Sequence, residues 1–120
     1  AVGTGGTIAG LIESSASHQH ILGFSALKGD FLKQDIQCWT KKTNWSLSDA
    51  YCGNGYAKTT VELLQFIDNF ERQYSIPLEH IYTGKMMMGL FDLIQQHHFP
   101  ENTRILAIHT GGLQGKIKTY

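Results

Sequence analysis

The sequence has no excess charge of either sign, because ten Lys and Arg residues are balanced by ten Asp and Glu residues. Without a basic field there is nothing to gather a nucleic acid, so this class of partner is excluded. The longest unbroken apolar runs are only a few residues, which is too short for a membrane span. A charged N-terminal region followed by an apolar stretch, typical of a signal peptide, is also missing. We therefore expect a cytoplasmic protein that binds neither nucleic acids nor membranes.

Cysteine is scarce, and no cluster of metal ligands is evident. Cys38 and Cys52 are the only cysteines, and they lack CxxC spacing. They are enough for one disulfide, but this usage favours free thiols in a reducing compartment. A metal site needs three or four converging ligands. The pair His18 and His20 and the pair at 97–98 are far apart in the sequence, so we expect no metal site.

Hydrophobic residues make up 42% of the 120 positions, which is enough for a core. This length suits one small domain or a piece of a larger one. Helix-like periodicity alternates with short apolar runs that are typical of buried strands. Helices are expected at 7–16, 30–42, 59–74 and 85–99, strands at 20–27, 80–84 and 103–110, and a loop at 43–58.

This alternation predicts an α/β fold of three layers, a mainly parallel sheet with helices on both faces. The third helix carries a further start signal, a capping box formed by Thr59 and Glu62. In such a sheet, ligands bind at the carboxyl ends of the strands. The glycine- and threonine-rich turns at 3–7, 82–84 and 109–112 are expected to meet at that rim.

The first of these turns, "GTGGT", has the features of a phosphate-binding loop. Glycines let several backbone N–H groups converge without side chains in the way. Threonine hydroxyls add donors, and the start of the following helix favours an anion. The loop is not a Walker motif, since no Lys-Ser/Thr pair closes it. We predict that Thr4, Gly5, Gly6 and Thr7 bind a phosphate group.

Three other interpretations of the chain remain open at this point. The loop is a tight turn without a ligand, or it binds a dinucleotide, because Gly3, Gly5 and Ala9 fall near the required spacing. Dinucleotide-binding proteins usually carry an acidic residue for the ribose at the position of Lys28. The lysine therefore weakens the case for NAD and leaves NADP as the candidate dinucleotide. The third interpretation is a non-catalytic α/β interaction module that keeps the fold and binds no cofactor.

Four motifs in order carry a resemblance to a known family: "GTGGTIAG" at 3–10, "YCGNGYA" at 51–57, "YTGK" at 82–85 and "IHTGG" at 108–112. They resemble pyridoxal-phosphate (PLP) enzymes of the tryptophan-synthase β fold. The match is closest to the D-cysteine desulfhydrase and aminocyclopropane-carboxylate (ACC) deaminase family, and it runs through residues 1–115. The resemblance implies α,β-elimination or deamination of a small amino acid, which releases ammonia and a 2-oxo acid. It also implies a homodimer.

The resemblance assigns roles to individual residues. Tyr82 matches an active-site tyrosine that positions or deprotonates the substrate, and Tyr56 matches a second one. The pattern around Tyr56 departs from the family, which usually has a proline within "GNG" and "YG" in place of "YA". Thr83 and Thr110 are expected to face the cofactor ring nitrogen. The deaminases carry a glutamate at the position of Thr83, whereas the desulfhydrases have the "YTG" version.

In this family the lysine that binds PLP covalently lies far upstream of the glycine loop. A Ser-Asn-His turn follows that lysine, and neither feature is found in these 120 residues. Lys85 is part of "YTGK" and belongs to a helix start in the resemblance. The chain therefore resembles the C-terminal portion of the larger, phosphate-binding domain, and the fragment alone is expected to be inactive.

Overall fold

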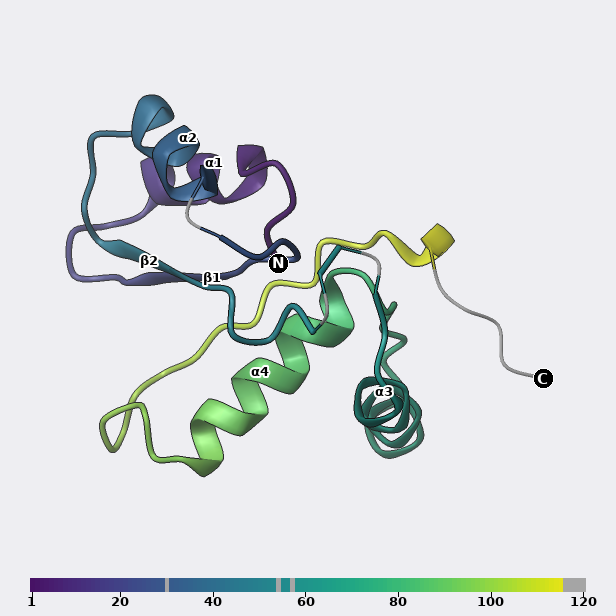
Figure 1. Ribbon diagram of the computed structural model, residues 1–120. Coiled ribbons are helices and arrows are strands. Elements are labelled where there is room, and N and C mark those ends of the chain that lie inside the picture. Colours follow the sequence, from purple (N-terminus) through teal and green to yellow (C-terminus); the bar gives the residue numbers. More distant parts are fainter. Residues whose placement is uncertain (30, 54, 57, 116–120) are drawn as a thin grey trace.

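The computed structural model describes residues 1–29, 31–53, 55–56 and 58–115. Helices and short strands follow one another along the chain (Figure 1). The helices are α1 (Gly6–Ser14), α2 (Phe31–Trp39), α3 (Val61–Tyr74) and α4 (Thr83–Gln95), the strands are β1 (Ile21–Phe24) and β2 (Trp45–Ser48), and the 3₁₀ helix η1 spans Leu113–Gly115.

The sheet is parallel throughout the part of the chain that is described. β1 and β2 pair in parallel, with Ile21 opposite Trp45 and Phe24 opposite Ser48. A parallel bridge joins Val2 to Ser25, and the Val2 N–H donates to the Phe24 carbonyl at 2.9 Å. The first residues of the chain therefore run along β1 before they turn into α1. This places the glycine loop at the carboxyl end of a strand-like segment.

Helices cover both faces of this sheet, so the predicted three-layer α/β fold is confirmed. α1 and α2 lie on one face and α4 on the other (Figure 1). Gly23 in β1 lies at the closest point, because a Cβ there would be 2.5 Å from the Ile8 side chain and 2.7 Å from Leu47. The core between the sheet and the first two helices contains Val2, Ile8, Ile12, Leu32 and Ile36, and the opposite core contains Phe24, Met86 and Leu90.

α3 packs against α4 through an aromatic-rich cluster. Phe66, Phe70 and Tyr74 on α3 each lie within about 6 Å of another ring, and Phe91 on α4 contacts all three. Edge-to-face ring pairs of this kind add stability beyond burial alone. The amphipathic character predicted for this helix is confirmed.

Two predicted strands are absent from the described residues, and one strand was missed. The expected strand 80–84 is a turn that leads into α4, because the helix begins at Thr83. The expected strand 103–110 has no regular secondary structure and forms no ladder there, and Leu106 is 85% exposed. Conversely, β2 lies inside the expected loop 43–58. Its "WSLS" sequence is half polar and only half-buried, so it lacks the apolar run typical of a buried strand.

Helix boundaries differ from expectation by a few residues. The cap of α3 is Thr60, whose hydroxyl accepts a 3.1 Å bond from the Leu63 N–H, so the predicted box with Thr59 as cap is wrong by one position. α4 ends at Gln95, before the expected limit of 99, and His97 has a positive φ of 56°. A left-handed residue stops a helix in this way.

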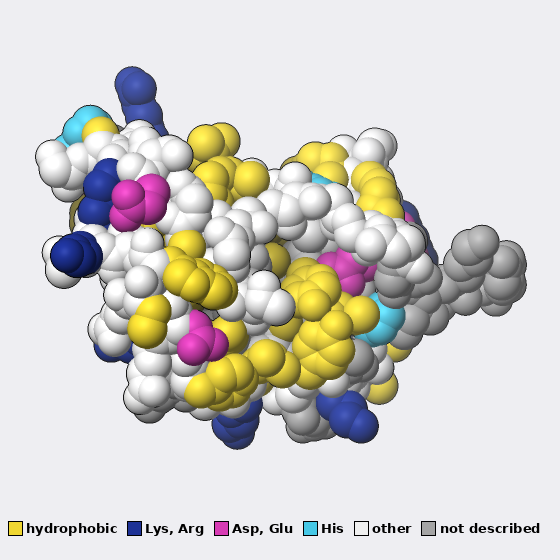
Figure 2. All heavy atoms as spheres, turned by 90° about the horizontal axis from the view of Figure 1, so that it is seen from above, with side chains coloured by type: hydrophobic (Ala, Val, Ile, Leu, Met, Phe, Trp, Pro, Cys, Tyr) yellow, Lys and Arg dark blue, Asp and Glu magenta, His cyan; other side chains and the backbone are white. Residues whose placement is uncertain are grey.

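The described residues form no large field of one charge sign on the face seen from above (Figure 2). In the view from above, Lys and Arg side chains lie scattered around the edge, and apolar surface is divided into separate patches (Figure 2). Both cysteines are free, as predicted, with Cys38 exposed and Cys52 buried. Among the described residues, no helix combines the length and apolar character needed to cross a membrane.

Candidate active site

The glycine loop turns sharply into α1 at Gly5. This residue is the N-cap of the helix with φ 96° and ψ −2°, a left-handed conformation that favours glycine. A Cβ at Gly5 would lie 3.1 Å from the Ile36 side chain, so the loop is packed closely against α2. The Gly5 carbonyl accepts the first helical bond, from the Ala9 N–H at 3.0 Å. The loop is therefore held rigidly from its carbonyl side.

The N–H side of the loop opens into a small hollow. Residues 1–8 line this hollow, whose volume is about 60 Å³. No side chain caps α1, and within the described part of the chain the N–H groups of Gly6 and Thr7 form no hydrogen bond. Thr4 and Thr7 are exposed at the same place. Free amides at the positive end of a helix fit a tetrahedral oxyanion, which a phosphate group provides.

Tyr82 and Tyr56 come together beside this loop. A Cβ on Gly3 would lie 3.0 Å from the Tyr82 ring and 3.2 Å from its hydroxyl, so Tyr82 packs directly on the loop backbone. The Tyr82 hydroxyl donates to the Tyr56 hydroxyl at 3.1 Å, and the two rings meet edge to face. The two tyrosines predicted for the active site are in contact, although 26 positions separate them.

The hydrogen bond sets the protonation state of Tyr82. Donation to Tyr56, followed by burial and the nearby Glu79, raises the pKa of Tyr82 to about 12. An unperturbed tyrosine has a pKa near 10. At neutral pH Tyr82 therefore keeps its proton in this arrangement and is suited to donate it. To accept a proton it would need the opposite arrangement, with Tyr56 as the donor.

Glu79 organises the start of α4, a role that the sequence interpretation missed. Its buried carboxylate accepts bonds from the N–H groups of Ile81, Tyr82 and Thr83 at 2.5, 2.7 and 2.6 Å. A negative charge at a helix N-terminus is stabilising, and here it also fixes the backbone of Tyr82. The available signal was an acidic residue four positions before the threonine of "YTGK", since this spacing suits a cap.

The two threonines predicted to face the cofactor ring have different environments. Thr83 is fully buried, its hydroxyl accepts from the Glu79 N–H at 3.0 Å, and it does not line the hollow. Thr110 is exposed, next to His109, whose ring contacts the Pro77 carbonyl at 2.8 Å. The ring-nitrogen contact of Thr110 stays a prediction. The ring-nitrogen contact of Thr83 also stays a prediction. It requires the Thr83 hydroxyl to break its hydrogen bond with Glu79.

Lys85 is the second residue that sequence reasoning missed. It is 2% exposed, and its Nζ donates to the Cys52 carbonyl at 2.8 Å and to the Gly55 carbonyl at 2.9 Å. Burial lowers the pKa of this ammonium group, while the neighbouring Cys52 and Glu79 act in the opposite direction. No local pattern predicts this contact, because the acceptors lie 30 and 33 positions away.

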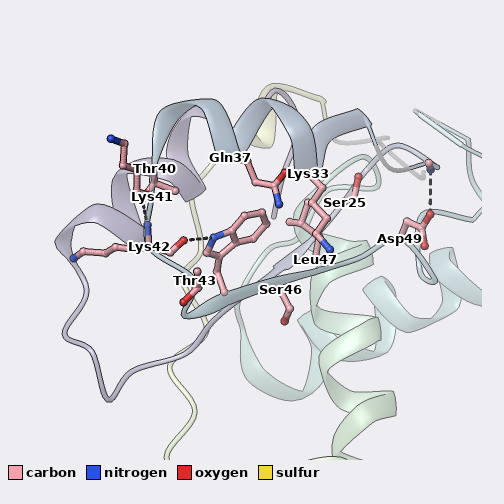
Figure 3. A pocket seen from close by; sticks show the side chains of 12 residues that line it. Ser25, Lys33, Gln37, Thr40, Lys41, Lys42, Thr43, Ser46, Leu47 and Asp49 are labelled. Carbon is pink, nitrogen blue, oxygen red and sulfur yellow. Dashed lines mark hydrogen bonds between the residues drawn. The ribbon is translucent and has the colours of Figure 1, made fainter.

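A larger cavity than the glycine-loop hollow lies elsewhere in the described chain, between α2 and β2. It has a volume of about 630 Å³ and contains none of the predicted site residues. Trp45 lines it, and the indole N–H of Trp45 donates to the Lys42 carbonyl at 2.8 Å. The Lys42 amine points away toward the end of α1 (Figure 3). The glycine loop and the tyrosine pair therefore define the candidate site, and this larger cavity does not.

A parallel sheet covered on both faces, with a glycine loop opening its first helix, defines the chain as an α/β protein of the three-layer class. No protein-family profile matches the sequence. The structure is similar to the crystal structure of an ACC deaminase homologue, with a TM-score of 0.81 and 29% sequence identity over 95% of this chain. The fold is thus that of part of an ACC deaminase-like protein. The chain spans 38% of the length of that homologue.

Proposed function

We propose that this chain is the C-terminal portion of the cofactor-binding domain of a PLP-dependent enzyme that acts on a small amino acid. The reaction is α,β-elimination or deamination, and its products are ammonia and a 2-oxo acid. One observation carries the proposal: Tyr82, whose hydroxyl donates to Tyr56, packs on Gly3 of a loop in which the Gly6 and Thr7 amides have no partner in the described chain. The likeness to an ACC deaminase homologue supports it.

The loop residues have the chemistry needed to hold the cofactor phosphate. Gly6 and Thr7 offer backbone N–H groups, and the hydroxyls of Thr4 and Thr7 are exposed beside them. The hollow of about 60 Å³ suits a phosphate group, since by this measure one water needs about 10–15 Å³. Bound PLP would supply an electron sink for carbanionic chemistry at the substrate.

The tyrosine pair would move a proton at the substrate. Tyr82 holds its proton at the hydroxyl while it donates to Tyr56, because its pKa is about 12. When Tyr56 turns to donate instead, the anionic form of Tyr82 is stabilised and Tyr82 becomes a base. A reversible hydrogen bond between two hydroxyls thus lets one pair serve both directions of proton transfer.

The residues predicted to face the ring nitrogen would favour elimination over opening of a cyclopropane ring. Thr83 and Thr110 are neutral hydroxyls, whereas a carboxylate would favour a protonated ring nitrogen and a stronger electron sink. A weaker sink suits a substrate whose leaving group departs readily. We therefore propose a D-cysteine-like substrate, with aminocyclopropane carboxylate as the second candidate.

The test uses the full-length protein with PLP. We expect visible absorbance from bound cofactor, and release of ammonia and a 2-oxo acid from D-cysteine faster than from aminocyclopropane carboxylate. Tyr82→Phe should lower kcat by about 10²–10⁴-fold with cofactor binding retained, because it removes a general acid–base group. The matched control is Tyr74→Phe, which changes an exposed ring on α3. Binding of NADP in place of PLP, or equal activity of both variants, would contradict the proposal.

A further inference from the structure

Lys85 joins two segments that are separate in the sequence. It lies in the first turn of α4, next to the buried Glu79, and its ammonium group reaches the loop that connects β2 to α3. Its two acceptors, the Cys52 and Gly55 carbonyls, are held at 2.8 and 2.9 Å. Gly55 immediately precedes Tyr56, so the contact lies one residue away from a tyrosine of the candidate site.

The connecting loop is held by few bonds of its own among the described residues, and Lys85 adds two more. Gly53 and Gly55 have positive φ values of 66° and 116°, which turn the backbone without help from a helix or ladder. Among the described residues of the loop, the Cys52 carbonyl accepts a 3.3 Å bond from the Gly55 N–H, and the Gly55 carbonyl accepts a 3.1 Å bond from the Lys58 N–H. A buried ammonium group is unfavourable unless it is well hydrogen-bonded, so a lysine here is explained by these two carbonyls.

We propose that Lys85 is a positioning residue that holds the Cys52–Gly55 loop so that the Tyr56 hydroxyl meets the Tyr82 hydroxyl. Tyr82 comes from the same helix start as Lys85, and Glu79 fixes its backbone. The lysine thus ties the loop that carries one hydroxyl to the element that carries the other. It lines neither the glycine-loop hollow nor the cavity between α2 and β2. Only the catalytic consequence rests on the proposed function.

The experiment measures the ionisation of Tyr82 by NMR of ring-labelled tyrosine in the full-length protein without added cofactor. Wild-type Tyr82 should ionise with a pKa of about 12 because it donates to Tyr56. Tyr56→Phe and Lys85→Met should each shift this value down toward about 10, the ordinary value for tyrosine. The double variant should show no further shift, because both changes break the same hydroxyl contact.

Two further variants make the outcome decisive. Lys33→Met removes an exposed lysine on α2 and should leave the Tyr82 pKa unchanged. If Lys85→Met does not fold, Lys85→Gln replaces it, since its amide can donate to one carbonyl; an intermediate pKa is then expected. An unshifted Tyr82 pKa in the folded Lys85 variant, or a double variant whose shift is the sum of two, would overturn the proposal.

The titration separates this inference from the proposed function. If the coupling of Lys85 to Tyr82 is found but no amino acid is turned over, the positioning role holds and the proposed enzyme activity fails. If both hold, Lys85→Met should lower kcat as Tyr56→Phe does, with little change in KM.

Discussion

Two glycines shape the candidate site because they have no side chain. Gly3 leaves room for the Tyr82 ring, and Gly5 adopts a left-handed conformation that turns the chain into α1. As a result, amides that a helix start cannot satisfy internally point at open space beside a tyrosine hydroxyl. The site therefore depends on glycine at positions 3 and 5 as well as on the tyrosine hydroxyls.

Gly3→Ala tests this arrangement. The added Cβ would lie 3.0–3.4 Å from three atoms of Tyr82, so the ring must move by a few tenths of an ångström. We expect a weaker Tyr82–Tyr56 hydrogen bond, seen as a lower Tyr82 pKa, with little loss of stability because the ring is partly exposed. The control is Gly10→Ala on α1, where a Cβ meets nothing within 4 Å. That change should add about 0.5–1 kcal/mol of stability and leave the Tyr82 pKa unchanged. Equal titration curves for both variants would show that Gly3 does not position Tyr82.

The sequence predicts residues whose chemistry is local and misses those whose role depends on distant contacts. The glycine loop, Tyr82 and Tyr56 stand in recognisable motifs, and the structure places them together. Glu79 and Lys85 are typical surface residues by type, because charged side chains are seldom buried without partners. The partners of Lys85 lie 30 and 33 positions away, so no local pattern marks this residue. The partners of Glu79 are N–H groups two to four positions further on, so its spacing to Thr83 was a usable local signal.

At the scale of elements, α4 depends on a charged cap from outside the helix. The Tyr82 residue at its N-cap position makes no side-chain capping bond, and the Glu79 carboxylate accepts the first N–H groups instead. This arrangement explains why the helix starts at Thr83, where an extended strand end was predicted. A carboxylate that gathers three N–H groups bends the chain into a helical turn.

Glu79→Gln should destabilise the protein by about 1.5–3 kcal/mol, because bonds to a charged acceptor are lost and an amide N–H₂ faces the helix start. The measurement is urea unfolding. Glu101→Gln is the control, since Glu101 is exposed and such changes are usually within about 0.5 kcal/mol. Comparable effects of the two substitutions would mean that the buried carboxylate does not stabilise α4.

The strand predictions for β2 and for segment 103–110 were wrong because a neighbouring strand, rather than composition, decides whether a segment forms a strand. The "WSLS" segment is a strand because β1 lies beside it in register, although its own pattern is half polar. The "TRILAIHT" segment has the apolar run of a strand, but no ladder partner is found for it in the described residues. Strand propensity measures how well a side chain suits a sheet, and it cannot supply the neighbouring strand.

At the scale of the whole molecule, segment 103–110 is the main apolar feature left uncovered. Ile105, Leu106 and Ile108 are 42%, 85% and 40% exposed, in a segment with no regular secondary structure. A long apolar segment with unpaired backbone groups is a template for strand addition. The chain also spans only 38% of the ACC deaminase homologue, so a longer protein of this fold has further segments that can pair here.

We therefore predict that this segment becomes a paired strand in the longer protein. In the 120-residue chain, the N–H groups of residues 105–108 should exchange with solvent rapidly, and the chain should self-associate at high concentration. In the longer protein the same groups should be protected by at least about tenfold, because ladder bonds must open before exchange. The β1 residues Leu22 and Gly23 serve as the internal reference, protected in both forms. Leu106→Lys should reduce self-association of the short chain, because charge on an exposed strand blocks edge pairing. Rapid exchange of residues 105–108 in the longer protein would show that the segment stays unpaired, and its apolar side chains would then need another explanation.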